Sequence, residues 1–223
     1  NKKYALYFAL SPAVLYSLNR NWDIWAIITL LLAIYYLDKG NTTKSSILLG
    51  ISIATKFFPI VILLPIGIFY FRNKQLKTFV RYLMMTSVTW LVINIPFMVI
   101  DLNGWFYFYK FSYERGLGSA SIYEVLQILN INVMSSTLLF YLLNIIIFIA
   151  VFIFLLKVQI PLNASESSFF VLLAFILFNK QYSMQYVIWL TSLCVLTLHH
   201  LNRSKRLLLY GFIMWQITEI AFQ

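Results

Sequence analysis

Apolar residues gather in nine runs along the chain, separated by short polar segments. The runs cover residues 4–18, 24–37, 46–56, 58–72, 82–100, 136–156, 168–178, 186–199 and 207–222. A helix needs about 20 apolar residues to cross the hydrocarbon core of a bilayer, and several of these runs are shorter. The pattern predicts an all-α, polytopic transmembrane helical bundle in which some helices are short or broken. We expect residues 1–223 to form a single transmembrane domain.

One long apolar stretch, from Ser46 to Phe71, is interrupted in its middle by Lys56 and Pro59. Proline lacks a backbone N–H and clashes with the preceding helical turn, so it kinks or breaks a helix. We therefore predict a helical hairpin whose tip lies at Lys56–Pro59.

The longest connection between apolar runs covers residues 101–135 and contains one amphipathic segment, Ser121–Leu129. Its apolar residues recur at helical spacing: Ile122, Val125, Leu126 and Leu129. Such a helix lies in the membrane interface, with its apolar face toward the lipid. We expect an amphipathic helix in this outer loop.

Composition and charge support a membrane protein. Hydrophobic residues make up 61% of the chain and charged residues 11%, whereas soluble domains carry about 25% charged residues. The net charge is +10, but the basic residues lie in the gaps between apolar runs and form no patch typical of nucleic-acid binding. With a cytoplasmic N-terminus, 12 of them fall inside and 5 outside, as the positive-inside rule requires. We expect an integral, multi-pass protein, in the plasma membrane if the cell is prokaryotic.

Tryptophans gather at the predicted outer ends of the apolar runs, at Trp22, Trp25, Trp105 and Trp189. Tryptophan is enriched at membrane interfaces, so an aromatic belt explains this distribution. A sugar-binding site, in which rings stack on aromatic side chains, explains it as well.

Three polar clusters interrupt the apolar pattern on the predicted outer side: Asn19–Asp23, Thr55–Pro59 and Phe178–Tyr186. A charge deep in a bilayer costs about 3 kcal/mol or more, so such residues usually line a cavity. Ordinary polar turns, with a lysine reaching up to the interface, are the alternative.

Together with Arg115, these clusters place several cations on one face near lipid. Arginine and lysine are the side chains that bind phosphates, so the set indicates a lipid phosphate or pyrophosphate. Asp23 and Glu114 are carboxylates available as a base or as acceptors of sugar hydroxyl groups.

The polar clusters resemble motifs of glycosyltransferase family 87, and in part eukaryotic GPI mannosyltransferase I. The matching segments, in chain order, are Asn19-Arg-Asn-Trp-Asp23, Gly50-x5-Lys56-x-x-Pro59, Arg115-Gly116-Leu117 with Ser119 and Ser121, and Asn179-Lys180 followed by Ser183-x-Gln185-Tyr186-x-x-Trp189. They occur in the family's order and span most of the chain.

The resemblance implies a GT-C fold and an integral-membrane enzyme. Such an enzyme takes a sugar, most commonly mannose, from a polyprenyl-phosphate donor. It passes the sugar to a lipid or glycan acceptor on the outer face, with inversion and a carboxylate as base. Lys56, Arg115 and Lys180 would lie near the donor phosphate. The expected substrate-binding set is Arg20, Lys56, Glu114, Arg115, Lys180, Gln185, Tyr186 and Trp189.

The chain departs from GT-C enzymes in one respect. These enzymes carry their catalytic acid in the first outer loop, often in a DxD-like motif, and no DxD occurs here. By motif order, the chain is expected to lack the first helix and first outer loop, and Asp23 is only a fallback for the catalytic base. No cofactor is certain, and a divalent cation stays open because some GT-C enzymes use one and others do not.

Two other functions compete with a glycosyltransferase. A transporter or flippase of a lipid-linked anion would place charges along its whole crossing, whereas the runs at 24–37, 82–100 and 136–156 carry none. A non-catalytic membrane subunit that only binds lipid is compatible with the same cations and stays open.

Overall fold

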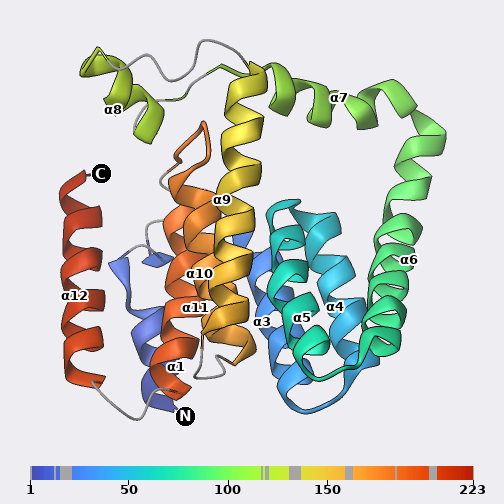
Figure 1. Cartoon of the computed structure of the whole chain (residues 1–223), viewed down its shortest axis with the longest axis horizontal. Coiled ribbons are helices and arrows are strands. Elements are labelled where there is room, and N and C mark those ends of the chain that lie inside the picture. Colours follow the sequence, from blue (N-terminus) through green and yellow to red (C-terminus); the bar gives the residue numbers. More distant parts are fainter. Residues whose placement is uncertain are drawn as a thin grey trace.

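The computed structural model describes residues 2–12, 14–15, 22–116, 118, 121–130, 137–158, 163–183, 185–200 and 205–222. Within these residues the regular structure is entirely helical, which confirms the predicted all-α class (Figure 1). The helices are α1 (Lys2–Ala9), α3 (Asp23–Asp38), α4 (Thr42–Thr55), the 3-10 helix η1 (Phe58–Ile62), α5 (Leu63–Arg72), α6 (Leu76–Ile100), α7 (Leu102–Glu114), α8 (Ile122–Ile128), α9 (Thr137–Lys157), α10 (Ala164–Leu177), α11 (Tyr186–His200) and α12 (Lys205–Phe222).

Each predicted apolar run overlaps at least one helix of the described chain. Two segments there are long and apolar enough to cross a membrane, Leu76–Ile100 in α6 and Phe140–Lys157 in α9. Only 6% and 11% of their most apolar windows are buried, so both present most of their apolar surface to the outside. Membrane-length apolar helices are thus present, and the multi-pass topology stays a prediction.

The predicted hairpin is confirmed around Lys56. Helix α4 ends at Thr55, and Lys56 adopts an extended conformation with φ −151° and ψ 137°. Pro59 lies in the first turn of η1, where a missing N–H costs nothing because the first N–H groups of a helix have no partner within it. Helix α5 then runs back in the direction opposite to α4 (Figure 1) and packs against α6, α9 and α10.

Small residues let α3, α4 and α6 approach closely. The Ser45 hydroxyl bonds a backbone carbonyl of α3 and lies 2.8 Å from the Tyr82 hydroxyl, and the Ser52 hydroxyl donates to another α3 carbonyl at 2.6 Å. A Cβ atom added at Gly50 would lie 2.7 Å from the Thr86 carbonyl oxygen. Interfaces of this kind, with small side chains and hydroxyl groups, are typical of helices packed in membranes.

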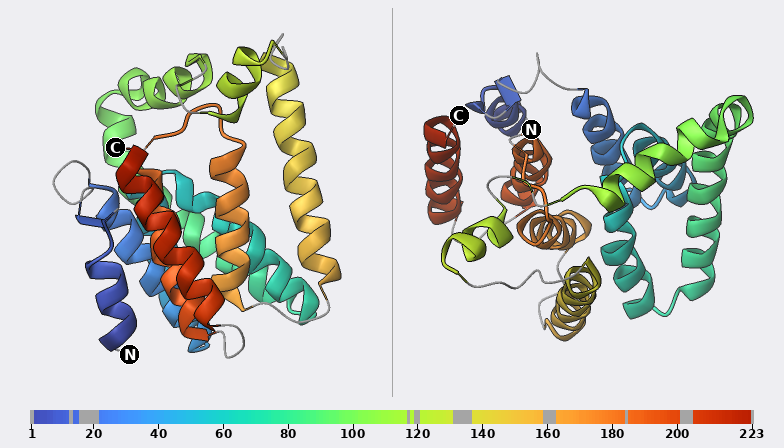
Figure 2. Two further views of the ribbon diagram at one scale, coloured as in Figure 1. Left: turned by 90° about the vertical axis from the view of Figure 1, so that its left-hand side faces the viewer. Right: turned by 90° about the horizontal axis from the view of Figure 1, so that it is seen from above.

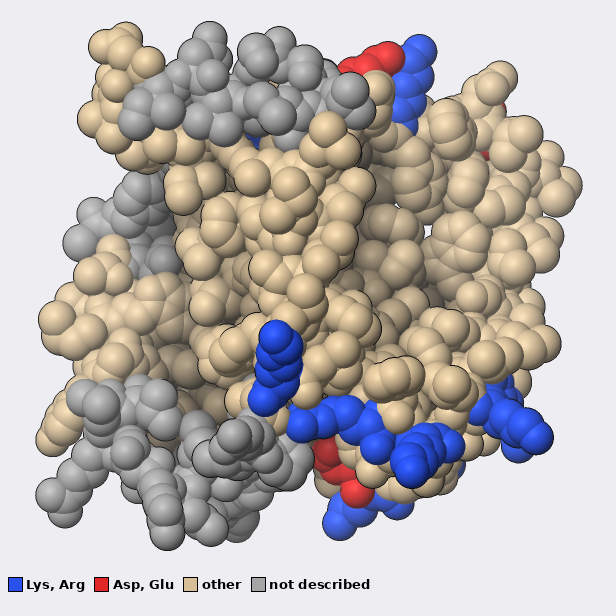
Figure 3. Space-filling model, viewed as in Figure 1, with Lys and Arg blue, Asp and Glu red and all other residues tan. Residues whose placement is uncertain are grey.

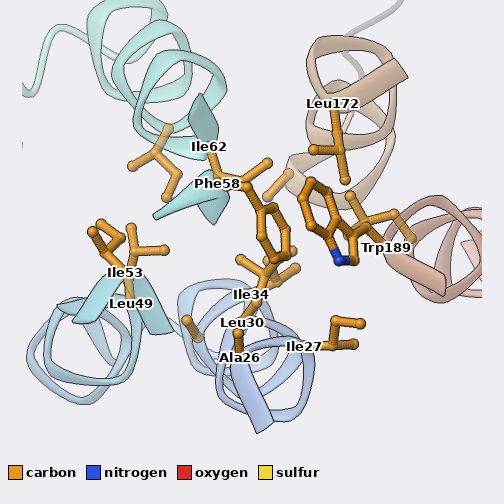
Figure 4. Packing of buried hydrophobic residues seen from close by; sticks show 14 of the residues in the cluster. Ala26, Ile27, Leu30, Ile34, Leu49, Ile53, Phe58, Ile62, Leu172 and Trp189 are labelled. Carbon is orange, nitrogen blue, oxygen red and sulfur yellow. The ribbon is translucent and has the colours of Figure 1, made fainter. Parts of the chain in front are cut away.

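The largest buried cluster joins this first group of helices to α10 and α11 (Figure 4). At its centre the rings of Phe58 and Trp189 stack with centroids 3.7 Å apart and planes 6° from parallel. Around them lie Ala26, Ile27, Leu30, Ile34, Leu49, Ile53, Ile62 and Leu172. The cluster therefore fixes the position of α11 against the hairpin tip.

Helix α7 lies across one end of the bundle, between α6 and the helices around α9 (Figures 1 and 2). Asp101 begins it as the N-cap, accepting from the Gly104 N–H at 3.0 Å, and the Trp105 indole donates to the Asn94 side chain of α6 at 2.8 Å. Residues 101–135 were predicted to hold one helix, at Ser121–Leu129. Helix α8 confirms that helix, whereas the sequence pattern did not reveal α7.

Basic residues separate between the two ends of the bundle. The α3–α4 and α5–α6 turns and the last residue of α9 lie at the lower end in Figure 1, where Figure 3 shows Lys and Arg side chains gathered. Those segments hold Lys39, Lys44, Arg72, Lys74, Lys77 and Lys157. The hairpin tip, α7 and the α10–α11 loop face the other way, in agreement with the predicted division of the charges.

We predict that Gly50→Ala destabilises the protein by about 1–3 kcal/mol, because the new methyl group meets backbone and packed helices do not part without cost. Thermal unfolding in detergent micelles measures the effect. Gly211→Ala in α12 is the matched control, since a Cβ there meets nothing within 4 Å and alanine favours a helix. Equal melting temperatures for the two variants would contradict the close packing of α4 on α6.

Candidate functional site

Asp23 and Lys56, from two of the three predicted polar clusters, meet at one point with Trp189, which follows the third cluster. Asp23 is the first residue of α3, and its side chain is 1% exposed. Its Oδ1 lies 2.8 Å from the Lys56 Nζ, and its Oδ2 accepts a 2.7 Å hydrogen bond from the Trp189 indole. The start of a helix is also where its dipole favours a negative charge.

This arrangement determines what Asp23 can do. A buried carboxylate is costly unless it is paired and hydrogen-bonded, and here both oxygens have a partner. A general base must instead reach the proton that it removes. The geometry favours a role for Asp23 in positioning Lys56, whose side chain is 31% exposed, over the fallback role as catalytic base.

A cavity of about 520 Å³ adjoins this contact, between η1, α7, α9 and the α10–α11 loop. Three cations line it: Lys56, Arg115 and Lys180. Gln185, Tyr186 and Trp189 line it as well, and the Tyr186 and Trp189 rings have centroids 4.2 Å apart. The structure thus brings together six of the residues predicted to bind substrate.

Lys180 and Arg115 bring positive charge to the cavity wall. The Lys180 side chain donates to the Tyr113 carbonyl at 2.8 Å, and the residue is only 9% exposed. Burial, and next the charge of Arg115, lower the pKa of Lys180. Within the described part of the chain no ion pair engages either side chain, so this wall of the cavity attracts anions.

Hydrogen bonds between the segment after α7 and the α10–α11 loop keep Arg115 and Lys180 on the wall of the same cavity. The Gly118 N–H donates to the Lys180 carbonyl at 2.9 Å, and the Gln181 side chain donates to the Gly116 carbonyl. A Cβ atom at Gly118 would meet the end of the Gln181 side chain, which would have to move away from its present position. The segment after α7 is therefore tied to the α10–α11 loop.

One predicted site residue lies away from the cavity. Glu114 is at the end of α7, with its side chain 60% exposed and 3.9 Å from Lys110, and it does not line the cavity. Arg20 lies outside the described residues.

Aromatic residues of α7 complete the cavity, and the sequence reasoning missed them. Tyr109, Phe111 and Tyr113 line the space, together with Phe57 at the hairpin tip. The signal was present, because Trp105, Tyr109 and Tyr113 recur every four residues, as on one face of a helix.

Among the described residues, no group of three or more His, Cys, Asp or Glu side chains lies close enough together to hold a metal ion. Whether a divalent cation takes part stays a prediction.

Comparisons of this chain with protein-family models, with curated proteins and with solved structures give no match. The resemblance to glycosyltransferase family 87 therefore stays a prediction from the motifs, and a function has to be argued from the residues themselves.

We predict that Lys56→Met lowers the free energy of unfolding by about 1–3 kcal/mol, because it leaves the Asp23 carboxylate buried without its cation. The partial exposure of Lys56 sets the low end of that range. The double variant Asp23→Asn, Lys56→Met is expected to recover part of the loss, since an amide is cheaper to bury than a charge.

Thermal unfolding of the two single variants and the double variant in the same detergent measures this coupling. If the changes in unfolding free energy of the two single variants simply add up in the double variant, the Asp23–Lys56 ion pair is contradicted.

Proposed function

We propose that this chain belongs to an integral, multi-pass membrane glycosyltransferase that moves a sugar, with mannose the first choice, from a polyprenyl-phosphate donor to a lipid or glycan acceptor. The observation that carries the proposal is the cavity in which Lys56, Arg115 and Lys180 share one space with the rings of Tyr186 and Trp189.

The cations suit the donor phosphate. Arginine and lysine bind phosphate oxygens through charge-assisted hydrogen bonds, and Lys56 is held in place by Asp23. When the bond between the sugar and the phosphate breaks, negative charge grows on the departing polyprenyl phosphate. Fixed cations stabilise such a charge most strongly where water is largely excluded.

The aromatic and amide side chains suit the sugar. Tyr186 brings an aromatic ring to the cavity and packs against Trp189, which is itself buried and stacked on Phe58. The Gln185 side chain lines the same space. A pocket that combines apolar walls with a few convergent polar groups is typical of small-ligand sites.

The charge distribution supports a membrane orientation with the cavity outside. Basic turns gather at the end of the bundle opposite the hairpin tip, and by the positive-inside rule that end is cytoplasmic. A donor with its phosphate in the outer leaflet then meets the cations directly.

A lipid-binding subunit without transferase activity is the second candidate. It is favoured by one observation, the engagement of both Asp23 oxygens, which leaves this carboxylate unsuited to act as a base.

Transfer from a defined donor separates the two candidates. Membranes from cells expressing the protein receive radiolabelled polyprenyl-phosphate mannose, or a labelled nucleotide sugar while charging of polyprenyl phosphate is blocked. Label should enter lipid or glycan only from the polyprenyl donor. If mannosyl, glucosyl and arabinosyl polyprenyl donors all give no transfer, the subunit becomes the better account.

We predict that Arg115→Gln raises the KM for the donor about tenfold, because one charge-assisted bond to phosphate is worth about 1.5 kcal/mol or more. Lys110→Gln is the matched control, since it removes the same charge from the same segment outside the cavity. Its KM should stay within about twofold of the parent's. Equal effects of the two substitutions would remove Arg115 from the donor site.

A further inference from the structure

A second cavity, of about 410 Å³, lies beside the cationic one, and we call it the apolar chamber. Ile53, Ile60 and Leu63 form its wall on the hairpin, α6 contributes Ser87 and Trp90, and Phe106 of α7 closes one side. No charged side chain lines it among the described residues.

The apolar chamber and the cationic cavity are neighbours that share three lining residues, Phe57, Ile60 and Tyr109. The rings of Phe57 and Tyr109 meet edge to face, with centroids 5.5 Å apart. Lys56 directly precedes Phe57, so a cation stands where the two spaces adjoin. An anionic group at Lys56 could carry an apolar extension past these rings.

The apolar chamber also reaches the outer surface of the bundle. Figure 3 shows the surface hollowed between α6 and the central helices, and the atoms around the hollow are uncharged. Helix α6, which borders the apolar chamber, carries exposed apolar side chains along its length. A lipid chain that leaves the apolar chamber past α6 would therefore enter the hydrocarbon of a bilayer.

An apolar space of this size suits an apolar occupant. Protein interiors are packed closely, and water finds few hydrogen-bond partners between Ile, Leu and Trp side chains. A free phosphate or a soluble phosphosugar would use the cations and leave the apolar chamber unfilled. A lipid with an anionic headgroup fills both.

We propose that the apolar chamber binds the first isoprenoid units of a polyprenyl phosphate whose phosphate lies among Lys56, Arg115 and Lys180. This inference rests on the proposed function for the identity of the lipid. It goes further in assigning a path for the isoprenoid chain of the lipid between η1, α6 and α7. The Phe57–Tyr109 pair then lies where the phosphate headgroup ends and the isoprenoid chain begins.

A photoactivatable lipid tests the path directly. The probe is a polyprenyl phosphate without sugar that carries a diazirine within its first few isoprenoid units, added to the purified protein in lipid nanodiscs. Cross-links should concentrate on α6 near Ser87 and on α7 near Phe106. Ser87→Phe fills the apolar chamber and should reduce cross-linking about tenfold.

Two further variants control the experiment. Val92→Phe adds the same ring to another exposed face of α6 and should leave the cross-links unchanged. Ser87→Ala should behave as the parent does, which separates loss of space from loss of the hydroxyl group. Cross-links confined to other helices, or unaffected by Ser87→Phe, would overturn the assignment.

The outcomes distinguish this inference from the proposed function. Cross-linking in the apolar chamber without any sugar transfer would support lipid binding there and contradict the proposed transferase activity. A second outcome is sugar transfer with a KM that Ser87→Phe leaves unchanged for both long-chain and two-isoprene donors. That result would support the transferase and overturn the proposal that the apolar chamber binds the lipid. The proposed path requires Ser87→Phe to raise the KM of the long-chain donor several-fold more than that of the short one.

Discussion

The buried carboxylate of Asp23 is the constraint on which the geometry of the site depends. An unpaired carboxylate in an apolar interior costs several kcal/mol, so the fold must bring a cation and a donor to it. Lys56 comes from the broken hairpin and Trp189 from α11, and both lie within 3 Å of the same side chain. The stacking of Phe58 on Trp189 continues this contact into the core. A single charge thereby joins α3, the hairpin tip and α11.

From this junction the structure builds a site with two distinct environments. One side is polar, where Arg115 and Lys180 join Lys56 around a cavity that also contains aromatic rings. The other side is apolar and lies between the hairpin, α6 and α7. Helix α7 borders both spaces, since Tyr109 lines each of them. A ligand with a phosphate and a long hydrocarbon chain matches both environments at once, which is why a lipid-linked donor is the substrate class that we favour.

Sequence reasoning predicted the helices well and the contacts only in part. Continuous apolar runs located the helices, and Lys56 and Pro59 located the hairpin tip, because both signals are local. Helix α7 was missed because its polar and aromatic residues interrupt the hydrophobic pattern, although its four-residue repeat of aromatic side chains was readable. The bond between Asp23 and Trp189 joins positions 166 residues apart, and no local pattern specifies such a pair. The three cations of the cavity were found through their charge, and Gln185, Tyr186 and Trp189 through the resemblance to a family. Glu114 lies outside the cavity because the rotation of α7 decides which way it points, and the sequence does not reveal that rotation.

Native mass spectrometry of the purified protein tests the central claim most directly. The protein is released from micelles after incubation with a polyprenyl phosphate or with the matching neutral polyprenol. The account predicts that the phosphate is retained and the alcohol is not, and that replacing Arg115 and Lys180 together by glutamine abolishes retention. Two results would contradict a cationic site for a lipid phosphate. One is equal retention of polyprenyl phosphate and polyprenol, and the other is unchanged retention of polyprenyl phosphate after Arg115 and Lys180 are both replaced.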